Sequence, residues 1–300
     1  KGAADIYNMP VRPDDIFVAS FQRSGTTLTQ ELVWLIANNL DYETAAKTSI
    51  ADRYPFLDIF MTYNSNWRKD LLNTIDDQET KMKTEKLLLN IGYPVTEKLL
   101  RAPSPRFIKT HVPLSLLPPK LLDTARMVYV ARDPRDVAVS SYHMSRLFTA
   151  YDFGGTFKDY WKLFIKDLAT ISPYFAQVIE AWEHRHNPNM LFLFYEEITK
   201  DMPSTIRRVS NFLDKELSTE QVEQLCDHLK FDNFKTNKAV NYEGLREYSI
   251  LSPDEAFIRK GKSGGWREYF DEDMTQEAKQ WIAENLRDTD LRFPNMDIEI

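Results

Sequence analysis

The chain has 300 residues, 43% hydrophobic and 28% charged, a composition typical of a folded globular protein rather than a disordered one. Its formal net charge of -7 argues against broad binding to nucleic acids or anionic membranes, so any anionic ligand requires a local basic pocket. The single cysteine, Cys226, excludes an internal disulfide framework and predicts a reducing compartment, the cytoplasm, and no apolar run approaches the roughly 20 residues that span a bilayer.

Four short apolar runs predict β-strands over residues 16–20, 106–109, 127–131 and 190–194. Helical patterns separate them, over residues 26–40, 134–147, 157–171, 173–184, 203–213 and 218–229. Alternating strands and helices indicate an α/β fold with a central parallel sheet flanked by helices. We expect one domain over residues 1–300, with ligands bound beyond the carboxyl ends of the strands.

Residues 67–100 differ from the rest of the chain. They are rich in charge, and helical periodicity surrounds Leu87, Leu88 and Leu89. Two interpretations stay open, a solvated helical hairpin and a lid over a binding pocket.

The turn Arg23-Ser24-Gly25-Thr26-Thr27, between the first strand and the first long helix, has the groups of an oxyanion site. It supplies a guanidinium, three hydroxyls, a sterically free glycine and the first amides of a helix, which point toward a bound anion. An ordinary N-capped helix would explain Ser24 or Thr26 but would give Arg23 no role. In nucleotide-triphosphate loops a lysine follows the second glycine, whereas here the cation precedes the glycine, so kinase chemistry is only an alternative.

This turn resembles the phosphosulfate-binding loop of the cytosolic sulfotransferase family. Three further segments resemble the same family in the same order, the Lys-Thr-His run at 109–111, the segment 129–140 and the glycine-containing segment 259–266. The resemblance implies a P-loop-like strand-loop-helix and a PAPS-dependent sulfotransferase of EC 2.8.2 type. Such an enzyme transfers a sulfuryl group from 3′-phosphoadenylyl sulfate (PAPS) to a hydroxyl of a small lipophilic alcohol or phenol and leaves adenosine 3′,5′-bisphosphate (PAP).

The resemblance also implies which residues hold PAPS. The turn from Arg23 to Thr27 would hold the 5′-phosphosulfate, and Leu28 would lie against the adenine. The other implied contacts are Arg132, Ser140, Arg259, Lys260 and Gly261 for the 3′-phosphate, and Tyr195 and Phe231 for the adenine. Alternatives stay open: Arg132 could form an ion pair with Asp133 or Asp136, and the aromatic residues could belong to the core.

His111 lies at the predicted end of a strand, where this architecture builds its active site. A neutral imidazole suits the removal of a hydroxyl proton near neutral pH, and the resemblance assigns this role to His111. Lys109 and Arg23 would stabilise the sulfuryl oxygens during in-line transfer, with no metal required. Considered alone, a histidine at a strand end is more often structural.

The sequence departs from the family at several positions. Arg23 stands where the family has lysine, Gln22 where it has proline, Leu28 where it has tryptophan, and Arg267 where it has lysine. The segment that the family uses for dimerisation is absent after Phe270, so a homodimer stays possible but is not expected by that route. The segment 56–111 is longer than in common vertebrate members, which favours an invertebrate-type member and an acceptor-site lid.

Apolar residues near the motifs are the candidates for the acceptor pocket. Together with the catalytic pair they are Phe21, Phe56, Lys109, His111, Met144, Phe148 and Tyr242. The apolar ones could equally belong to the core, and the sequence does not separate a phenol, a sterol and a long-chain alcohol. The alternatives are a P-loop-type nucleotide kinase, a silent nucleotide or lipid carrier, and net dehydration of an allylic alcohol through its sulfate ester.

Overall fold

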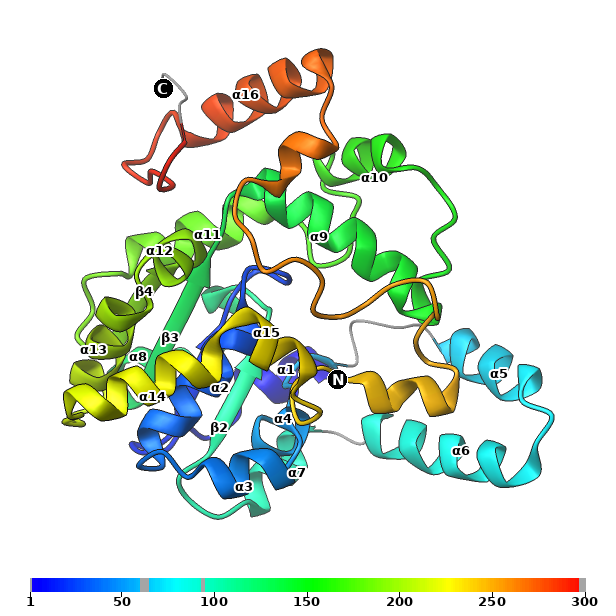
Figure 1. Ribbon diagram of the computed structural model, residues 1–300, viewed down its shortest axis with the longest axis horizontal. Helices are drawn as coiled ribbons and strands as arrows, with labels where there is room; N and C mark the ends of the chain where they lie inside the picture. Colours follow the sequence, from blue (N-terminus) through cyan, green and yellow to red (C-terminus); the bar gives the residue numbers. More distant parts are fainter. Residues whose placement is uncertain (1, 60–64, 93–94, 297–300) are drawn as a thin grey trace.

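A four-stranded parallel sheet lies at the centre of the fold (Figure 1). The computed structural model describes residues 2–59, 65–92 and 95–296. The strands β1 (Ile16–Ala19), β2 (Phe107–Thr110), β3 (Arg126–Ala131) and β4 (Met190–Phe194) are ordered β2-β1-β3-β4, and all three pairings are parallel. The carboxyl ends of the strands therefore lie along one edge of the sheet, as the sequence predicted.

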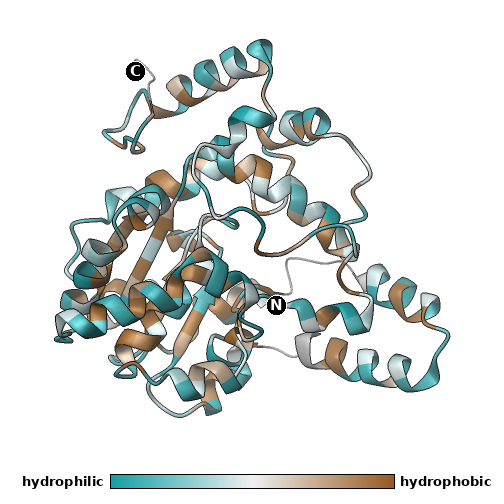
Figure 2. Ribbon diagram, viewed as in Figure 1, coloured by the Kyte–Doolittle hydropathy of each residue, from teal (hydrophilic) through white to brown (hydrophobic). Residues whose placement is uncertain are grey.

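Alternating strand residues enter two separate hydrophobic cores, because successive side chains of a strand point to opposite faces. Phe17 and Ala19 of β1 belong to the core that helices α9, α10, α11 and α16 cover, whereas Val18 belongs to the core beneath α2, α13 and α14. Figure 2 shows the strands as hydrophobic and the helices as mixed, with hydrophilic residues outside. Cys226 packs at the edge of the second core.

The α-helices surround the sheet. Their bounds are α1 (Gly2–Tyr7), α2 (Thr26–Ala37), α3 (Tyr42–Lys47), α4 (Ile50–Arg53), α5 (Ser65–Thr74), α6 (Gln78–Gly92), α7 (Val95–Arg101), α8 (Leu121–Thr124), α9 (Pro134–Leu147), α10 (Phe157–Phe164), α11 (Tyr174–Glu183), α12 (Tyr195–Lys200), α13 (Met202–Phe212), α14 (Thr219–Leu229), α15 (Phe231–Thr236) and α16 (Glu272–Leu286). The 3₁₀-helices are η2 (Leu114–Leu116), η3 (Thr149–Tyr151), η4 (Glu243–Tyr248) and η5 (Gly265–Glu268).

Two predicted helices are longer than the observed ones. The helix expected over residues 26–40 ends at Ala37, since Asn39 and Leu40 have positive φ angles of 54° and 62°. The helix expected over 157–171 ends at Phe164, and Asp167 has a φ of 56°. Left-handed backbone ends a right-handed helix whatever the apolar pattern beyond it.

The segment 67–100 is helical, as predicted, and residues 93–94 of it lie outside the described part. Helices α5 and α6 form a hairpin that projects to the side of the sheet, beside η4 (Figure 1). A third hydrophobic cluster joins them to the segment around η4, with Leu71 and Leu88 on the hairpin and Ile250 and Leu251 opposite. The hairpin is thus packed on one side and is not solvated all round. Within the described ranges, none of the helices combines the length and apolar character needed to cross a membrane.

Candidate active site

A cavity of about 900 Å³ opens at the carboxyl edge of the sheet. Most of the predicted site residues line it, namely Arg23, Gly25, Thr26, Thr27, Leu28, Phe56, Lys109, His111, Arg132, Ser140, Met144, Phe148, Tyr195, Phe231, Tyr242, Arg259, Lys260 and Gly261. Segments that are far apart in the sequence thus meet around one space, as expected where parallel strands end. Four motifs recognised separately in the sequence form one site.

Two predicted residues do not line this cavity. Phe21 was expected in the acceptor pocket, but it is fully buried in the core, with its ring 5.0 Å from that of Tyr174 and 6.1 Å from that of Phe164. The turn directs it toward α10 and α11, so nearness to the motif in sequence was misleading. Ser24 is also fully buried, and its hydroxyl has no hydrogen-bond partner among the described residues.

The first turn of α2 is free to bind an anion. Gly25 occupies the N-cap position with a φ of 104°, and no side chain caps the helix, so the interpretation as an ordinary capped helix is wrong. The hydroxyl of Thr26 is instead 2.6 Å from that of Ser20. Uncapped amides at a helix N-terminus attract negative charge.

Arg23 connects the turn to the far side of the cavity. Its Nε donates to the Ser140 hydroxyl at 3.0 Å, and Nη2 donates to the Phe257 carbonyl oxygen at 2.9 Å. Burial, together with the charges of Arg132 and Arg259, lowers the pKa of Arg23 to about 10. Mutual repulsion among the partly buried guanidinium groups of Arg23, Arg132 and Arg259 is relieved by a bound anion, and this cation cluster therefore fits a multiply charged ligand.

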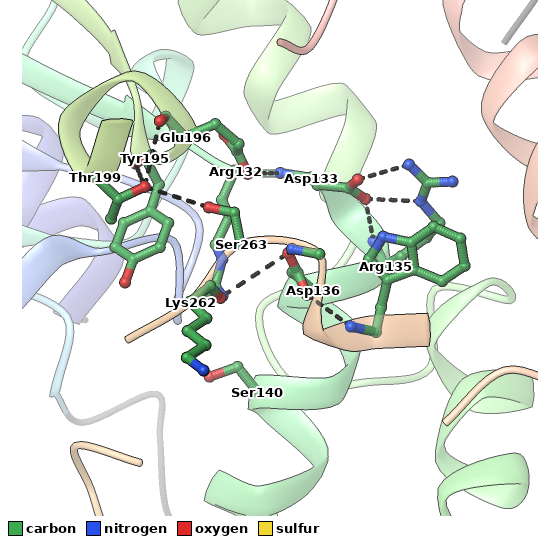
Figure 3. Close-up of polar contacts among 12 residues, drawn as sticks. Arg132, Asp133, Arg135, Asp136, Ser140, Tyr195, Glu196, Thr199, Lys262 and Ser263 are labelled. Carbon is green, nitrogen blue, oxygen red and sulfur yellow. Dashed lines mark hydrogen bonds and ion pairs between the residues drawn. The ribbon is translucent and has the colours of Figure 1, made fainter. Parts of the chain in front are cut away.

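The Arg132 side chain is held against the glycine-containing segment (Figure 3). Its Nη2 donates to the Lys262 carbonyl oxygen at 2.9 Å, and its guanidinium lies 4.4 Å from the centre of the Tyr195 ring. Asp136 is 4.0 Å from this guanidinium, but its carboxylate mainly accepts the Gly264 and Trp266 amides, at 2.6 and 2.9 Å. The alternative of a purely structural ion pair thus leaves most of the contacts of Arg132 unexplained.

Aromatic rings lie directly over two glycines of the site. A Cβ atom on Gly25 would be 2.5 Å from the Tyr195 ring, and one on Gly261 would be 2.2 Å from the Phe231 ring. Both glycines have positive φ, and both positions thus exclude a side chain for two independent reasons. The two rings and Leu28 line the cavity, which gives an apolar place for a flat heterocycle beside the cations.

The ring, the backbone amide and the backbone carbonyl oxygen of His111 each make a hydrogen bond. Its Nδ1 donates to the Ser20 carbonyl oxygen at 2.8 Å, which places the ring proton on Nδ1 because a carbonyl oxygen only accepts. The backbone amide donates to Asp58 at 3.0 Å, and Gln177 donates to the backbone carbonyl oxygen at 2.6 Å. Burial and the nearby Lys109 hold the pKa of His111 well below its usual value, which leaves Nε2 as an unprotonated base.

Lys109 lies beside this base. Its ammonium group is 4.2 Å from the centre of the Phe56 ring, which in turn contacts the His111 ring edge to face at 5.1 Å. Burial lowers the pKa of Lys109 to about 8, while the Asp58 carboxylate opposes this shift. A cation, a neutral base and an aromatic wall therefore meet at the end of β2.

The sequence did not indicate several further residues of the cavity. Tyr151 of η3 lines it beside Phe148, and Trp67 and Leu87 contribute from the α5–α6 hairpin. Tyr151 follows a motif segment, but no sequence pattern marks it as a cavity residue. For Trp67 the lid interpretation of residues 67–100 is the one indication in the sequence.

A family model described as "Sulfotransferase domain" matches residues 13–290. The chain belongs to the sulfotransferase family. It is 34% identical over 289 residues to luciferin sulfotransferase from Photinus pyralis, covering 94% of this chain and 74% of that protein. It is 28% identical over 291 residues to sulfotransferase 1 family member D1 from Rattus norvegicus, covering 97% of this chain and 89% of the relative.

Solved structures agree with the family. A crystal structure of retinol dehydratase in complex with androsterone and PAP matches the present structure with a TM-score of 0.93 and 53% identity, over 98% of this chain and 87% of that chain. A mouse sulfotransferase complexed with PAP has the same fold, with a TM-score of 0.69 and 22% identity over 96% of this chain and 89% of that chain. The sulfotransferase therefore transfers a sulfuryl group from PAPS, and the kinase alternative is set aside.

Proposed function

We propose that His111 is the general base, that Lys109 and Arg23 stabilise the transferring group, and that the cation cluster holds both phosphate ends of PAPS. The fixed Nδ1–H tautomer of His111 carries this proposal, because it presents Nε2 to the cavity to take the acceptor's hydroxyl proton. PAPS supplies the activated sulfuryl group. The uncapped amides of α2, Arg132 and Ser140 supply donors for such a multiply charged anion.

We propose a lipophilic alcohol as the acceptor. The cavity beside His111 is walled by apolar and aromatic side chains, among them Phe56, Met144 and Phe148. A related protein, 53% identical, has been crystallised with retinol or androsterone together with PAP. With an allylic alcohol, the sulfate ester could lose sulfate, which takes the electrons of the C–O bond, together with a proton from the carbon chain, and give an alkene. This net dehydration shares the first step; the ester is the product we propose.

We also propose that the α5–α6 hairpin is the acceptor-site lid of a single domain that spans the chain. Trp67 and Leu87 support this, because they line the same cavity as His111 and belong to a hydrophobic cluster separate from the two main cores. The cytoplasm is the compartment that we propose for the enzyme, in keeping with its one cysteine.

The test compares wild-type protein with His111→Asn, using PAPS, a lipophilic alcohol and EDTA. We expect EDTA-resistant turnover in the wild type and a loss of about 10²- to 10⁴-fold in the variant, the usual contribution of a general base. Calorimetry should show sub-millimolar PAP binding to both proteins, since His111 is not among the proposed phosphate contacts.

Product analysis completes the test. A sulfate ester supports the proposed product, and an alkene from an allylic alcohol would replace it with net dehydration. Substantial turnover by His111→Asn would refute the base assignment, and absence of PAP binding by the wild type would refute the cofactor site.

A further inference from the structure

A carboxylate that does not reach the cavity lies directly behind the proposed base. Asp58 is fully buried and is absent from the residues that line the cavity, so it cannot contact either substrate. It follows the short extended segment that pairs with the outer edge of β2, where the Leu57 amide donates to the Lys109 carbonyl oxygen at 2.9 Å and the Lys109 amide donates to that of Pro55 at 3.1 Å. This pairing brings Asp58 to the end of β2.

Asp58 accepts three contacts from two consecutive residues, the last residue of β2 and the one after it. The Thr110 hydroxyl donates to Oδ1 at 2.8 Å, and the His111 amide lies 3.0 Å from Oδ1 and 3.2 Å from Oδ2. These bonds fix the backbone from which the imidazole projects. A positional error of about 1 Å at a reacting group costs on the order of 10²-fold in rate.

The charge of Asp58 has a second consequence. Besides Asp58, the charged groups that act on the proposed base are Lys109 from β2 and Arg23 from the phosphosulfate loop, and both are positive. Proton transfer to His111 adds a third positive charge in a buried place. Asp58 raises the pKa of Lys109 against the burial that lowers it, and thereby opposes loss of the ammonium charge beside the base.

We propose that Asp58 is a positioning residue for this reaction: it fixes His111 through the backbone and keeps Lys109 protonated through its charge. The inference rests on the proposed roles of His111 and Lys109. Burial raises the pKa of Asp58 to about 6, so its carboxylate is charged at the pH where Lys109 begins to lose its proton, near its pKa of about 8.

Asp58→Asn affects both parts, because it removes the charge and replaces one of the two oxygens that accept from the His111 amide by an NH2 group, while one acceptor oxygen is kept. We expect kcat to fall at least about tenfold, with KM for the acceptor and the PAP affinity within about twofold of wild type. The alkaline limb of the pH profile should move to lower pH, since the pKa of Lys109 falls when the negative charge is removed. Asp58→Glu restores the charge and should return the limb to the wild-type pH.

Asp15→Asn is the matched control. Asp15 is equally buried and accepts from Arg106 Nε at 2.7 Å, but it lies at the opposite end of the same strands. We expect this variant to lower the melting temperature without moving the alkaline limb. If Asp58→Asn does not give folded protein, Asp58→Ser, which is smaller and retains an acceptor oxygen, takes its place.

If Asp58→Asn has the kcat and the alkaline limb of the wild type, this inference is overturned, while the proposed function stands. A loss of kcat that only parallels the melting temperature, as in the control, would also overturn it. Absence of PAPS-dependent turnover in the wild type would refute the proposed function and this inference with it.

Discussion

Lys109 and His111 are separated by one residue, and burial lowers the pKa of both, with opposite results for their charge. His111 becomes neutral well below its ordinary pKa, whereas Lys109, with a pKa of about 8, stays mostly charged near neutral pH. The pair therefore presents an unprotonated base and a cation side by side. In water a neutral histidine and a charged lysine coexist mainly between about pH 6.5 and about pH 10.4, their ordinary pKa values, whereas here both limits lie lower.

The pH dependence of turnover follows from these two shifts. As pH falls through about 6.5, the ordinary pKa of histidine, we expect no loss of rate from His111, because its pKa lies well below that value. A loss of rate near pH 6 would instead report the protonation of Asp58, whose pKa is about 6. As pH rises through about 8, the rate should fall, because Lys109 loses its charge. The measurement is kcat/KM against pH at saturating PAPS.

Lys109→Arg is the control for the alkaline limb. A guanidinium keeps its proton far above neutrality, so the limb should leave the accessible range even if the rate is lower. An unchanged limb in this variant would assign it to another group.

At the scale of elements, the described side chains of the α5–α6 hairpin contribute to the cavity but to neither main core. Its side chains Leu71 and Leu88 pack against Ile250 and Leu251, while Leu87 reaches both this cluster and the cavity. A change on the cavity side of α6 should therefore affect the acceptor and leave the cofactor site as it is.

Leu87→Ala tests the hairpin as an acceptor lid. Removing an apolar side chain from a lipophilic contact costs about 1–3 kcal/mol, so we expect KM for the acceptor to rise about tenfold while PAP affinity stays constant. Leu89→Ala is the matched control on the same helix, because Leu89 is 66% exposed. Equal KM values for the two variants would contradict a lid role for α6.

At the scale of the whole molecule, an acidic chain with a net charge of -7 concentrates cations at one edge of its sheet. Arg23, Arg132 and Arg259 come from three distant parts of the sequence and repel one another in the pocket. A ligand that neutralises them binds only the folded state, where the three parts meet, and so stabilises the whole chain.

PAP should therefore raise the melting temperature, by an amount that corresponds to about 2.7 kcal/mol at 100 times its Kd. Adenosine 5′-monophosphate at the same concentration should give a smaller increase, because it lacks the 3′-phosphate proposed for Arg132 and Arg259. Thermal denaturation in EDTA measures both. Equal shifts would show that the second phosphate makes no contact that matters.

The sheet and most of the site were predictable because each strand ends in a polar motif. Lys109, in β2, and His111, just after it, line the cavity at the strand end where the sequence predicted them, and the family was recognised from four motifs in order. Phe21 was misplaced because the direction of one side chain in a turn depends on backbone angles that a sequence does not display. The end of α10 was missed for a similar reason, the left-handed backbone at Asp167.

Asp58 was missed because its role depends on a pairing between two segments that are distant in sequence. Nothing in residues 55–58 indicates that they add an edge to β2, and a single carboxylate near a strand has many structural explanations. Contacts of this kind appear only when the register of the sheet is known.

The α5–α6 hairpin packs on a hydrophobic cluster that is separate from the two main cores. Because the described side chains of α5 and α6 pack through that cluster and not through the main cores, we expect the segment that bears Trp67 and Leu87 to tolerate replacement by the corresponding segment of a related enzyme. Arg23, Lys109, His111 and the phosphate contacts would be left unchanged by such an exchange. The part of the acceptor wall that we propose for the hairpin could thus differ between relatives while the proposed transfer groups stay the same.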